Sequence, residues 1–228
     1  MRSVLYSHFS PETNRLYAIV QLGGGLPNLE IAGIQMKSAT PSIEAVLKAS
    51  LRDLRPLRGL CLDTCGGLGY SAIAMAEAPA VEKVLSFEMD ANVIEAARHN
   101  PESAPLFESR KIELRNEDIA MTLPELREGS FDRIFHDPPR LGLAGDLYSL
   151  AFYRHLFRVL KPGGRLFHYT GAPGAKAGKR VRAGIIGRLH DAGFDAVREC
   201  PEAQGVSTVK PAAAGGEPLR QLARARLA

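Results

Sequence analysis

Short apolar runs alternate with amphipathic stretches along most of the chain, from Gly59 to about Val209. Apolar runs of about four to eight residues are typical of buried strands, and apolar positions three and four apart are typical of helices. The alternation predicts a mostly parallel sheet with helices on both faces, a Rossmann-like α/β fold. Strands are expected at 60–64, 81–88, 111–115, 133–136, 165–169, 196–200 and 206–210, and helices at 42–54, 70–78, 91–100, 147–160 and 178–192.

A smaller unit is expected before this core. Residues 14–21 and 29–36 contain apolar runs and flank the glycines 23–25, which predicts a β-hairpin. We therefore divide the chain into an extension of hairpin and helix (1–58), an α/β domain (59–210) and a mobile tail rich in alanine and glycine (211–228).

The segment Leu60–Tyr70 carries the strongest chemical signal. An apolar strand ends in Asp63, and a turn containing Gly67 and Gly69 leads into a helix. Such a corner binds nucleotides, because glycine lets a ligand approach the backbone and the helix start offers free N–H groups. The glycines also fit the dinucleotide fingerprint, but Asp63 would repel a pyrophosphate. The Asp63 carboxylate suits instead the ammonium of S-adenosylmethionine. Cys65, a small residue in the same turn, is expected beside this cofactor.

Two further strand ends carry carboxylates. Glu88 follows the second strand, where an acidic side chain can accept hydrogen bonds from both ribose hydroxyls. Asp118 follows the third strand and is a candidate acceptor for the adenine amino group, with Met89 and Ile119 on either side of the ring. The alternative for Asp118 is a helix cap, the role also expected for Asp90.

The fourth strand ends in the sequence His136–Arg140 (HDPPR). Two prolines cannot continue a ladder and hold a fixed extended bend. The bend presents the Asp137 carboxylate and the Pro138 carbonyl at the carboxyl edge of the sheet, where ligands bind in open α/β folds. Two fixed acceptors orient an amine nucleophile and stabilise the positive charge that develops on its nitrogen. Beside them, His136 is a candidate proton relay.

Composition narrows the class of protein. The 228 residues suit one domain with a large core, and no apolar run approaches the roughly 20 residues of a membrane span. Three cysteines and the lack of a signal-like start favour a reducing, cytoplasmic location, and no metal site is expected. The net charge of +4 permits an RNA partner, for which the candidate surface is Lys176, Lys179, Arg180 and Arg182. The oligomeric state is open, a homodimer being one option.

Several motifs together resemble one family. They are DTCGGLGY at Asp63–Tyr70, HDPPR at His136–Arg140, the aromatic stretch Leu147–Arg154 and FHYTGAPG at Phe167–Gly174. This set is similar to the predicted class I S-adenosylmethionine-dependent methyltransferases first described as archaeal and also called spermine-synthase-like. The resemblance implies a seven-stranded sheet with an antiparallel last strand, and it leaves the methyl acceptor open.

The chain departs from better-understood methyltransferases near the acceptor. Nucleic-acid amino-methyltransferases have an aromatic residue where this chain has Arg140, which weakens a nucleobase acceptor. Uridine C5-methyltransferases need a cysteine after the next strand, where this chain has none. The candidate acceptor-binding residues are Pro139, Arg140, Tyr148, His168 and Tyr169.

The sequence thus predicts an S-adenosylmethionine-dependent methyltransferase that modifies nitrogen, with a small-molecule acceptor favoured and RNA or protein as alternatives. The N-terminal hairpin, with Met36 and Lys37, is a candidate lid. One rival is an aminopropyltransferase, which the basic residues around the site disfavour because polyamine acceptors are cationic. Another is a nicotinamide-dependent oxidoreductase, which Asp63 disfavours.

Overall fold

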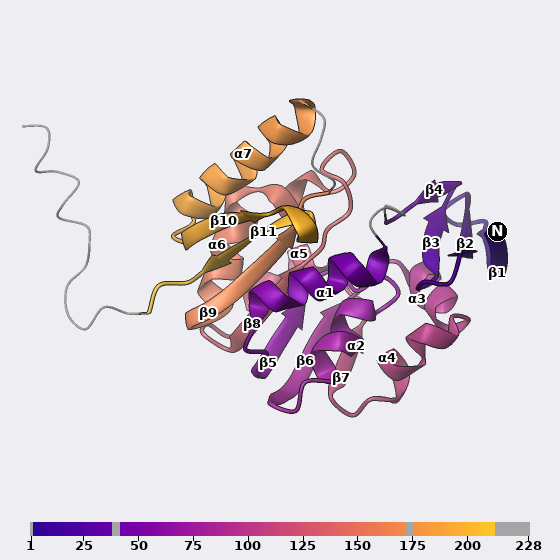
Figure 1. Ribbon diagram of the computed structural model, residues 1–228, viewed down its shortest axis with the longest axis horizontal. Coiled ribbons are helices and arrows are strands. Elements are labelled where there is room, and N and C mark those ends of the chain that lie inside the picture. Colours follow the sequence, from indigo (N-terminus) through magenta and orange to yellow (C-terminus); the bar gives the residue numbers. More distant parts are fainter. Residues whose placement is uncertain (1, 38–41, 172–175, 213–228) are drawn as a thin grey trace, which may run out of the picture.

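The computed structural model describes residues 2–37, 42–171 and 176–212, and a seven-stranded sheet forms its centre (Figure 1). The strands are β5 (Gly59–Asp63), β6 (Val81–Phe87), β7 (Ile112–Arg115), β8 (Phe131–His136), β9 (Leu160–Tyr169), β10 (Asp195–Cys200) and β11 (Gly205–Val209). Their order across the sheet is β10-β11-β9-β8-β5-β6-β7. Within this sheet β11 runs opposite to the other six strands, which are parallel to one another. The expected fold, including the antiparallel last strand, is confirmed.

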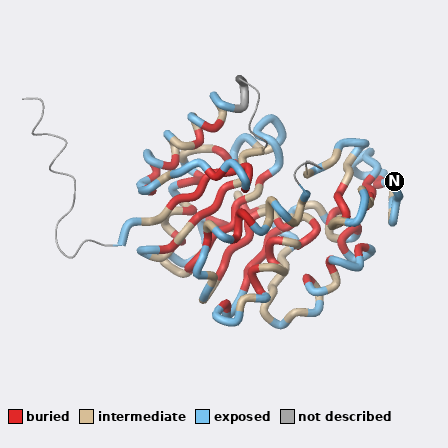
Figure 2. The backbone as a smooth tube through the Cα atoms, in the orientation of Figure 1, coloured by how far each residue is buried: buried red, intermediate tan, exposed pale blue. Residues whose placement is uncertain are grey.

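Helices cover both faces of the sheet. They are α1 (Ile43–Leu54), α2 (Tyr70–Ala76), α3 (Ala91–Arg98), α4 (Ala104–Glu108), α5 (Ile119–Thr122), α6 (Leu150–Val159) and α7 (Lys176–Asp191). Successive side chains of a strand point to opposite faces of the sheet, so the core has two parts. Cys61 packs with α1 to α4 on one face, and Leu62 packs with α5 to α7 on the other. Figure 2 shows the resulting buried centre, and every residue of β8 is buried. Strands buried on both faces are typical of parallel sheets.

Element boundaries differ from expectation at a few points. The helix expected from Leu147 begins at Leu150, because the Ser149 hydroxyl accepts the N–H of Phe152 and caps α6 there. A separate 3₁₀ turn, Gly145–Tyr148, precedes it. The short helices α4 and α5 were not expected, since five and four residues are too few to show a helical period.

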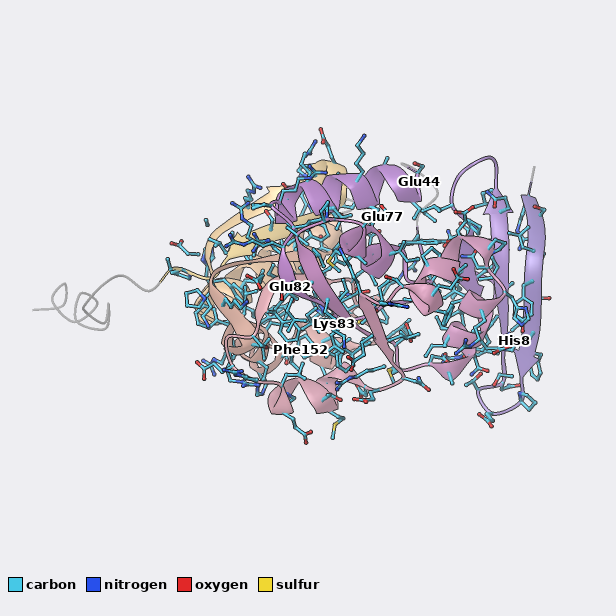
Figure 3. All side chains as sticks on the ribbon, turned by 90° about the horizontal axis from the view of Figure 1, so that it is seen from below. His8, Glu44, Glu77, Glu82, Lys83 and Phe152 are labelled. Carbon is cyan, nitrogen blue, oxygen red and sulfur yellow. The ribbon has the colours of Figure 1, made fainter. Side chains whose placement is uncertain are left out.

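A second, antiparallel sheet precedes the core. Its strands are β1 (Arg2–Ser10), β2 (Arg15–Leu22), β3 (Asn28–Ile31) and β4 (Ile34–Gln35), in that order. The expected hairpin is present as β2 and β3, and β1 extends it by pairing along the whole of β2. The sheet packs against α3: the Tyr17 hydroxyl donates to Asp90, and the Tyr6 ring stacks on His99 at 3.9 Å. In Figure 3 this sheet lies at one end of the molecule, where His8 Nε2 is 3.3 Å from Asn92 Oδ1.

The division at residues 58 and 210 stays a prediction. Most of the predicted tail, residues 213–228, lies outside the described residues. Among the described residues, no helix has the length and apolar character needed to cross a membrane.

Candidate active site at the carboxyl edge of the sheet

Strand register brings the predicted carboxylates together. Asp63, the last residue of β5, pairs in register with Ser86 of β6 on one side and with Phe135 of β8 on the other. Glu88 follows Ser86 by two residues, and Asp137 follows Phe135 by two. The three acidic side chains therefore project from adjacent strand ends at one edge of the sheet.

Asp63 is completely buried, with one oxygen satisfied and one free. Its Oδ2 accepts hydrogen bonds from the hydroxyls of Ser71 at 3.0 Å and Ser86 at 2.9 Å, whereas Oδ1 has no partner. Burial raises the pKa of Asp63 to about 7, and the nearby Asp137 adds to the rise. A buried carboxylate oxygen without a partner is costly, so the site fits a cationic group. The ammonium of a S-adenosylmethionine-type nucleoside would satisfy it.

The glycine turn forms an open cradle beside this carboxylate. Gly67 has a φ of 55°, and apart from its neighbours in the chain no residue has an atom within 4 Å of the position that a β-carbon would take. At Gly66, by contrast, a β-carbon would lie 2.6 Å from the Ser86 hydroxyl that holds Asp63. Gly69, with a φ of 84°, begins α2. The cradle leaves room for a ligand above Gly67 while the neighbouring glycines keep the turn compact.

Glu88 closes the cradle from the end of β6. Its Oε2 accepts the Gly67 N–H at 2.9 Å, and its Oε1 accepts the Asp90 N–H at 2.9 Å. Burial raises the pKa of Glu88, and these backbone N–H donors oppose the rise. Each carboxylate oxygen keeps a second lone pair, which is what two ribose hydroxyls need.

The structure places the third carboxylate at a helix start. Asp118 caps α5, where its Oδ1 accepts the Ala120 N–H at 2.8 Å. Ile119 is buried beneath it, and the Met89 side chain is 67% exposed. Asp90 likewise caps α3, as expected. The contacts of Asp118, Met89 and Ile119 with an adenine ring stay predictions.

On the acceptor side, Asp137 is bound to a lysine from the N-terminal unit. Lys37 Nζ forms an ion pair with Asp137 Oδ2 and lies 4.2 Å from the centre of the Tyr169 ring. Asn28 fixes the Lys37 backbone from both sides, because its Nδ2 donates to the Lys37 carbonyl at 2.7 Å and its Oδ1 accepts the Lys37 N–H at 3.2 Å. Tyr169 in turn donates its hydroxyl to Gln204. A carboxylate and an aromatic face together form a binding site for an alkylammonium group.

Beneath the Asp137 bend lie two buried histidines. A carbonyl can only accept, so His136 Nε2 donates to the Leu147 carbonyl at 3.1 Å, and Nδ1 accepts from the Thr64 hydroxyl at 2.7 Å. Burial lowers the pKa of His136 to about 3. Both ring nitrogens are thus bonded within the protein, and the role of His136 as a proton relay stays a prediction. His168 is equally buried, and its Nε2 lies 2.9 Å from the Tyr153 hydroxyl.

The other residues predicted near the methyl acceptor differ in how far they are buried. Pro138 is buried, whereas Pro139 and Arg140 are exposed. The Tyr148 hydroxyl donates to the Pro139 carbonyl at 2.9 Å and braces the bend. Cys65 is half-buried in the turn, and desolvation raises the pKa of its thiol well above the usual range. The thiol is therefore protonated and is a poor nucleophile at neutral pH.

Several site residues were missed from the sequence. Ser71 and Ser86 hold Asp63, Thr64 holds His136, and Asn28 holds Lys37. Small polar residues of this kind carry no distinctive spacing. Ser71 had one usable signal, its place in the first turn of the helix after the glycine corner.

Comparisons with known proteins agree with this geometry. Residues 61–164 match the family model described as a methyltransferase domain. In structure, the chain is similar to a spermidine synthase in complex with the transition-state analogue AdoDATO (TM-score 0.72, 21% identity, covering 91% of this chain and 73% of that one). A spermidine synthase from Thermotoga maritima gives a TM-score of 0.69 at 21% identity, covering 91% of this chain and 72% of that one. These similarities show a Rossmann-like methyltransferase fold.

Several proteins are also similar to the chain in sequence. An uncharacterized protein of Methanocaldococcus jannaschii is 42% identical over 81% of this chain and 64% of its own length. The polyamine aminopropyltransferase of Moorella thermoacetica is 34% identical over 47% of this chain and 38% of its own. Putrescine N-methyltransferase 4 of Nicotiana tabacum is 30% identical over 43% and 26%. The chain thus spans less than two thirds of each of these relatives. Their names and the matched domain model agree with the resemblance to class I, spermine-synthase-like proteins that the motifs carry.

One residue of the predicted RNA-binding surface forms an ion pair within the fold instead. Arg182 is buried and pairs with Glu199 at 3.1 Å. Lys179 and Arg180 are exposed, whereas the side chain of Lys176 lies outside the described residues. The buried Arg182 is unavailable for phosphate contacts, which leaves the RNA alternative without support here.

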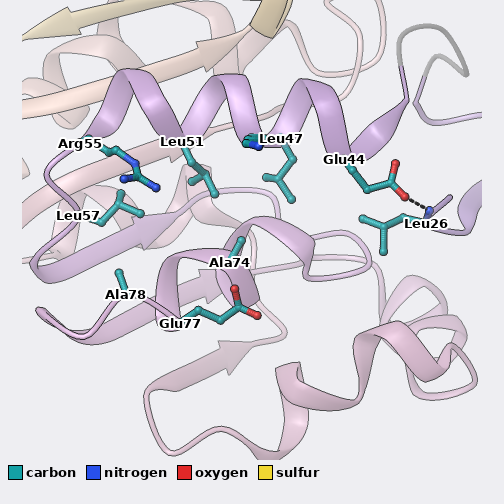
Figure 4. A pocket seen from close by; sticks show the side chains of 10 residues that line it. Leu26, Glu44, Leu47, Leu51, Arg55, Leu57, Ala74, Glu77 and Ala78 are labelled. Atoms are coloured by element: carbon teal, nitrogen blue, oxygen red, sulfur yellow. Dashed lines mark hydrogen bonds between the residues drawn. The ribbon is translucent and has the colours of Figure 1, made fainter.

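A cleft of about 400 Å³ lies elsewhere, between α1 and α2 (Figure 4). Leu47 and Leu51 of α1 and Ala74 of α2 line it, and Glu44 at one end accepts the Leu26 N–H. It contains none of the predicted site residues. Within the described ranges, no three histidine, cysteine or acidic side chains converge to form a metal site.

Proposed function

We propose that the chain transfers the methyl group of S-adenosylmethionine to the nitrogen of a small alkyl amine. The observation that carries the proposal is the site holding Lys37: a primary ammonium lies between the Asp137 carboxylate and the Tyr169 ring, at the place predicted for the acceptor. A group that binds there presents its nitrogen to the edge of the sheet where Asp63 and Glu88 line the donor corner.

The residues on each side have separate tasks. Asp63, Gly67 and Glu88 hold the donor nucleoside, whose sulfonium makes the methyl group electrophilic. Asp137 holds the acceptor nitrogen, and the Pro138 carbonyl is the second acceptor for its N–H groups. Catalysis then needs orientation and charge stabilisation rather than a covalent intermediate, with loss of an amine proton before attack.

The names of the relatives support an amine acceptor. Putrescine N-methyltransferase and polyamine aminopropyltransferase are both named for reactions on amine compounds. The second name also supports a rival, transfer of an aminopropyl group from decarboxylated S-adenosylmethionine. The two donors differ by one carboxylate. Their relative affinities for the chain therefore distinguish the two reactions.

Two measurements test the proposal. Titration calorimetry gives the affinity of the chain for each donor, and mass spectrometry identifies the products formed from 1,4-diaminobutane. We expect tighter binding of S-adenosylmethionine and a product heavier by one methyl group. A product heavier by one aminopropyl group, formed from the decarboxylated donor, would establish the rival reaction.

A further inference from the structure

We propose that Lys37 is a methylation site of the protein itself, with its ε-amine acting as an internal acceptor for the methyl group. This inference rests on the proposed function, because the same donor and the same Asp137 site would carry out the transfer. It adds a covalent modification of the N-terminal unit.

The first support is the depth at which the amine is held. The side chains of Lys37 and Asp137 are 32% and 15% exposed, and the Nζ atom lies over the Tyr169 ring. Ion pairs between fully exposed side chains form and break freely, whereas this one lies in a partly closed site with an aromatic wall. The ammonium therefore occupies the site in the same way as the amine of an acceptor would.

The second support is that the backbone of Lys37 is fixed. Two hydrogen bonds from the buried Asn28 side chain hold both the N–H and the carbonyl of Lys37. Asn28 belongs to β3, which pairs with β2. The sheet thus delivers the amine to Asp137 at little further cost in chain entropy, and pre-positioning of this kind raises the effective concentration of a nucleophile.

The third support is the position relative to the donor corner. The Thr64 N–H, which follows Asp63, donates to the Phe135 carbonyl at 3.1 Å, so β5 and β8 stay adjacent up to the point where Asp137 begins the bend. An amine at Asp137 is therefore next to the strand end whose carboxylate has a free oxygen.

Other described lysines have different surroundings. Lys83 pairs with Glu113, Lys111 donates to the Ala78 carbonyl, and Lys161 pairs with Asp132. Lys48 is exposed on α1. In the parts of the chain with described contacts, Lys37 is the lysine that reaches a predicted catalytic carboxylate.

The step is a direct displacement. The Lys37 ammonium first loses a proton to Asp137 or to water, which frees a lone pair on Nζ. That lone pair forms a bond to the methyl carbon as the sulfur–carbon bond breaks, and the electrons of the broken bond stay on sulfur. The products are S-adenosylhomocysteine, a protonated monomethyl-lysine and the released proton. Methylation keeps the charge of the lysine, so the product can remain between the carboxylate and the ring.

The experiment uses the full chain with methyl-labelled S-adenosylmethionine and no added acceptor, followed by peptide mass spectrometry. We expect label on Lys37, with a rate per molecule that does not change over a tenfold range of protein concentration, because the acceptor lies in the same chain. Lys37→Arg should remove the label, and the matched control Lys48→Arg should retain it. Addition of 1,4-diaminobutane should slow the labelling, since the two amines compete for Asp137.

The outcomes separate the two proposals. If 1,4-diaminobutane is methylated while Lys37 stays unlabelled in the wild-type chain, the inference is wrong and the proposed function stands. The inference is also wrong if the labelling rate per molecule rises in proportion to protein concentration, or if other lysines are labelled instead of Lys37. If neither amine receives a methyl group although the donor binds, both proposals fail together.

Discussion

The backbone N–H of Gly67 donates to the carboxylate of Glu88, with 2.9 Å between nitrogen and Oε2. The bond ties the turn after β5 to the end of β6 and sets the width of the cradle between them. Apart from its neighbours in the chain, no residue has an atom within 4 Å of the missing β-carbon of Gly67, so the open side of the cradle is available to a ligand.

Gly67→Ala is expected to weaken S-adenosylmethionine binding by tenfold or more. The added methyl group would occupy the space reserved for the nucleoside, and the φ of 55° would add strain of about 1 kcal/mol to the folded state. Gly129→Ala is the matched control, since Gly129 has a φ of 60°, equally open surroundings and a place before β8. Calorimetry and thermal unfolding separate the effects: both variants should lose stability, and only Gly67→Ala should lose affinity. Equal affinities would show that the cradle holds no ligand.

Binding of the cofactor should release a proton from Asp63 below pH 7. The pKa of this carboxyl group is raised to about 7 in the free protein, so the group is largely protonated at pH 6. An ammonium beside Oδ1 favours the charged form and lowers the pKa. Affinity should therefore rise with pH up to about 7 and then level off. Calorimetry at pH 6 in two buffers with different ionisation enthalpies measures the released proton. Asp63→Asn, which cannot titrate, should release none.

Asp137→Ala should reduce methyl transfer by about a hundredfold or more while donor affinity stays within several-fold. The carboxylate orients the acceptor and stabilises its charge, and the loss of one such group typically costs about a hundredfold to a thousandfold in rate. Asp146→Ala is the control, since Asp146 is an exposed acidic residue in the segment that follows the same bend. Single-turnover kinetics with labelled donor gives the rate. Full activity in Asp137→Ala would remove the assigned role.

The positions of Asp63, Glu88 and Asp137 could be predicted from the sequence for a general reason. Parallel strands have their carboxyl ends at one edge, so residues that end successive apolar runs come together without knowledge of the packing. The same reasoning gave the bounds of most strands, because a buried strand shows as a short apolar run between turn residues.

Contacts that depend on distant segments could not be predicted in this way. Lys37 lies a hundred residues before Asp137, and no local pattern indicates which carboxylate it reaches. Strand β1 was missed because its exposed positions include apolar residues, among them Leu5 and Phe9. Apolar and polar residues therefore do not alternate along the strand as they do when one face is buried and the other is polar. For Asp118, capping and ligand binding call for the same residue at the same place, and the sequence leaves both open.

Two buried imidazoles lie side by side under the active-site bend, with 4.4 Å between the ring centres of His136 and His168. Burial lowers the pKa of His136 to about 3, and it lowers the pKa of His168 well below its usual value, with the neighbouring His136 adding to the effect. Both rings are therefore neutral in the folded protein at pH 5, whereas the unfolded chain protonates them below about pH 6.5. The unfolded state binds more protons in this window, so the contribution of the histidines to stability falls as pH decreases.

His168→Gln should reduce this pH dependence. Between pH 6 and pH 5, each buried neutral histidine contributes a slope of about 1 kcal/mol per pH unit to the free energy of unfolding. Asp63 contributes a slope of the opposite sign, because its raised pKa makes the folded state bind more protons below pH 7. The slope of the variant must therefore be compared with the slope of the wild type. Urea unfolding at several pH values measures the difference in slope, and His190→Gln, which alters an exposed histidine of α7, is the matched control. An unchanged slope in His168→Gln would mean that this imidazole is already charged in the folded protein at pH 5 or that it titrates alike in both states.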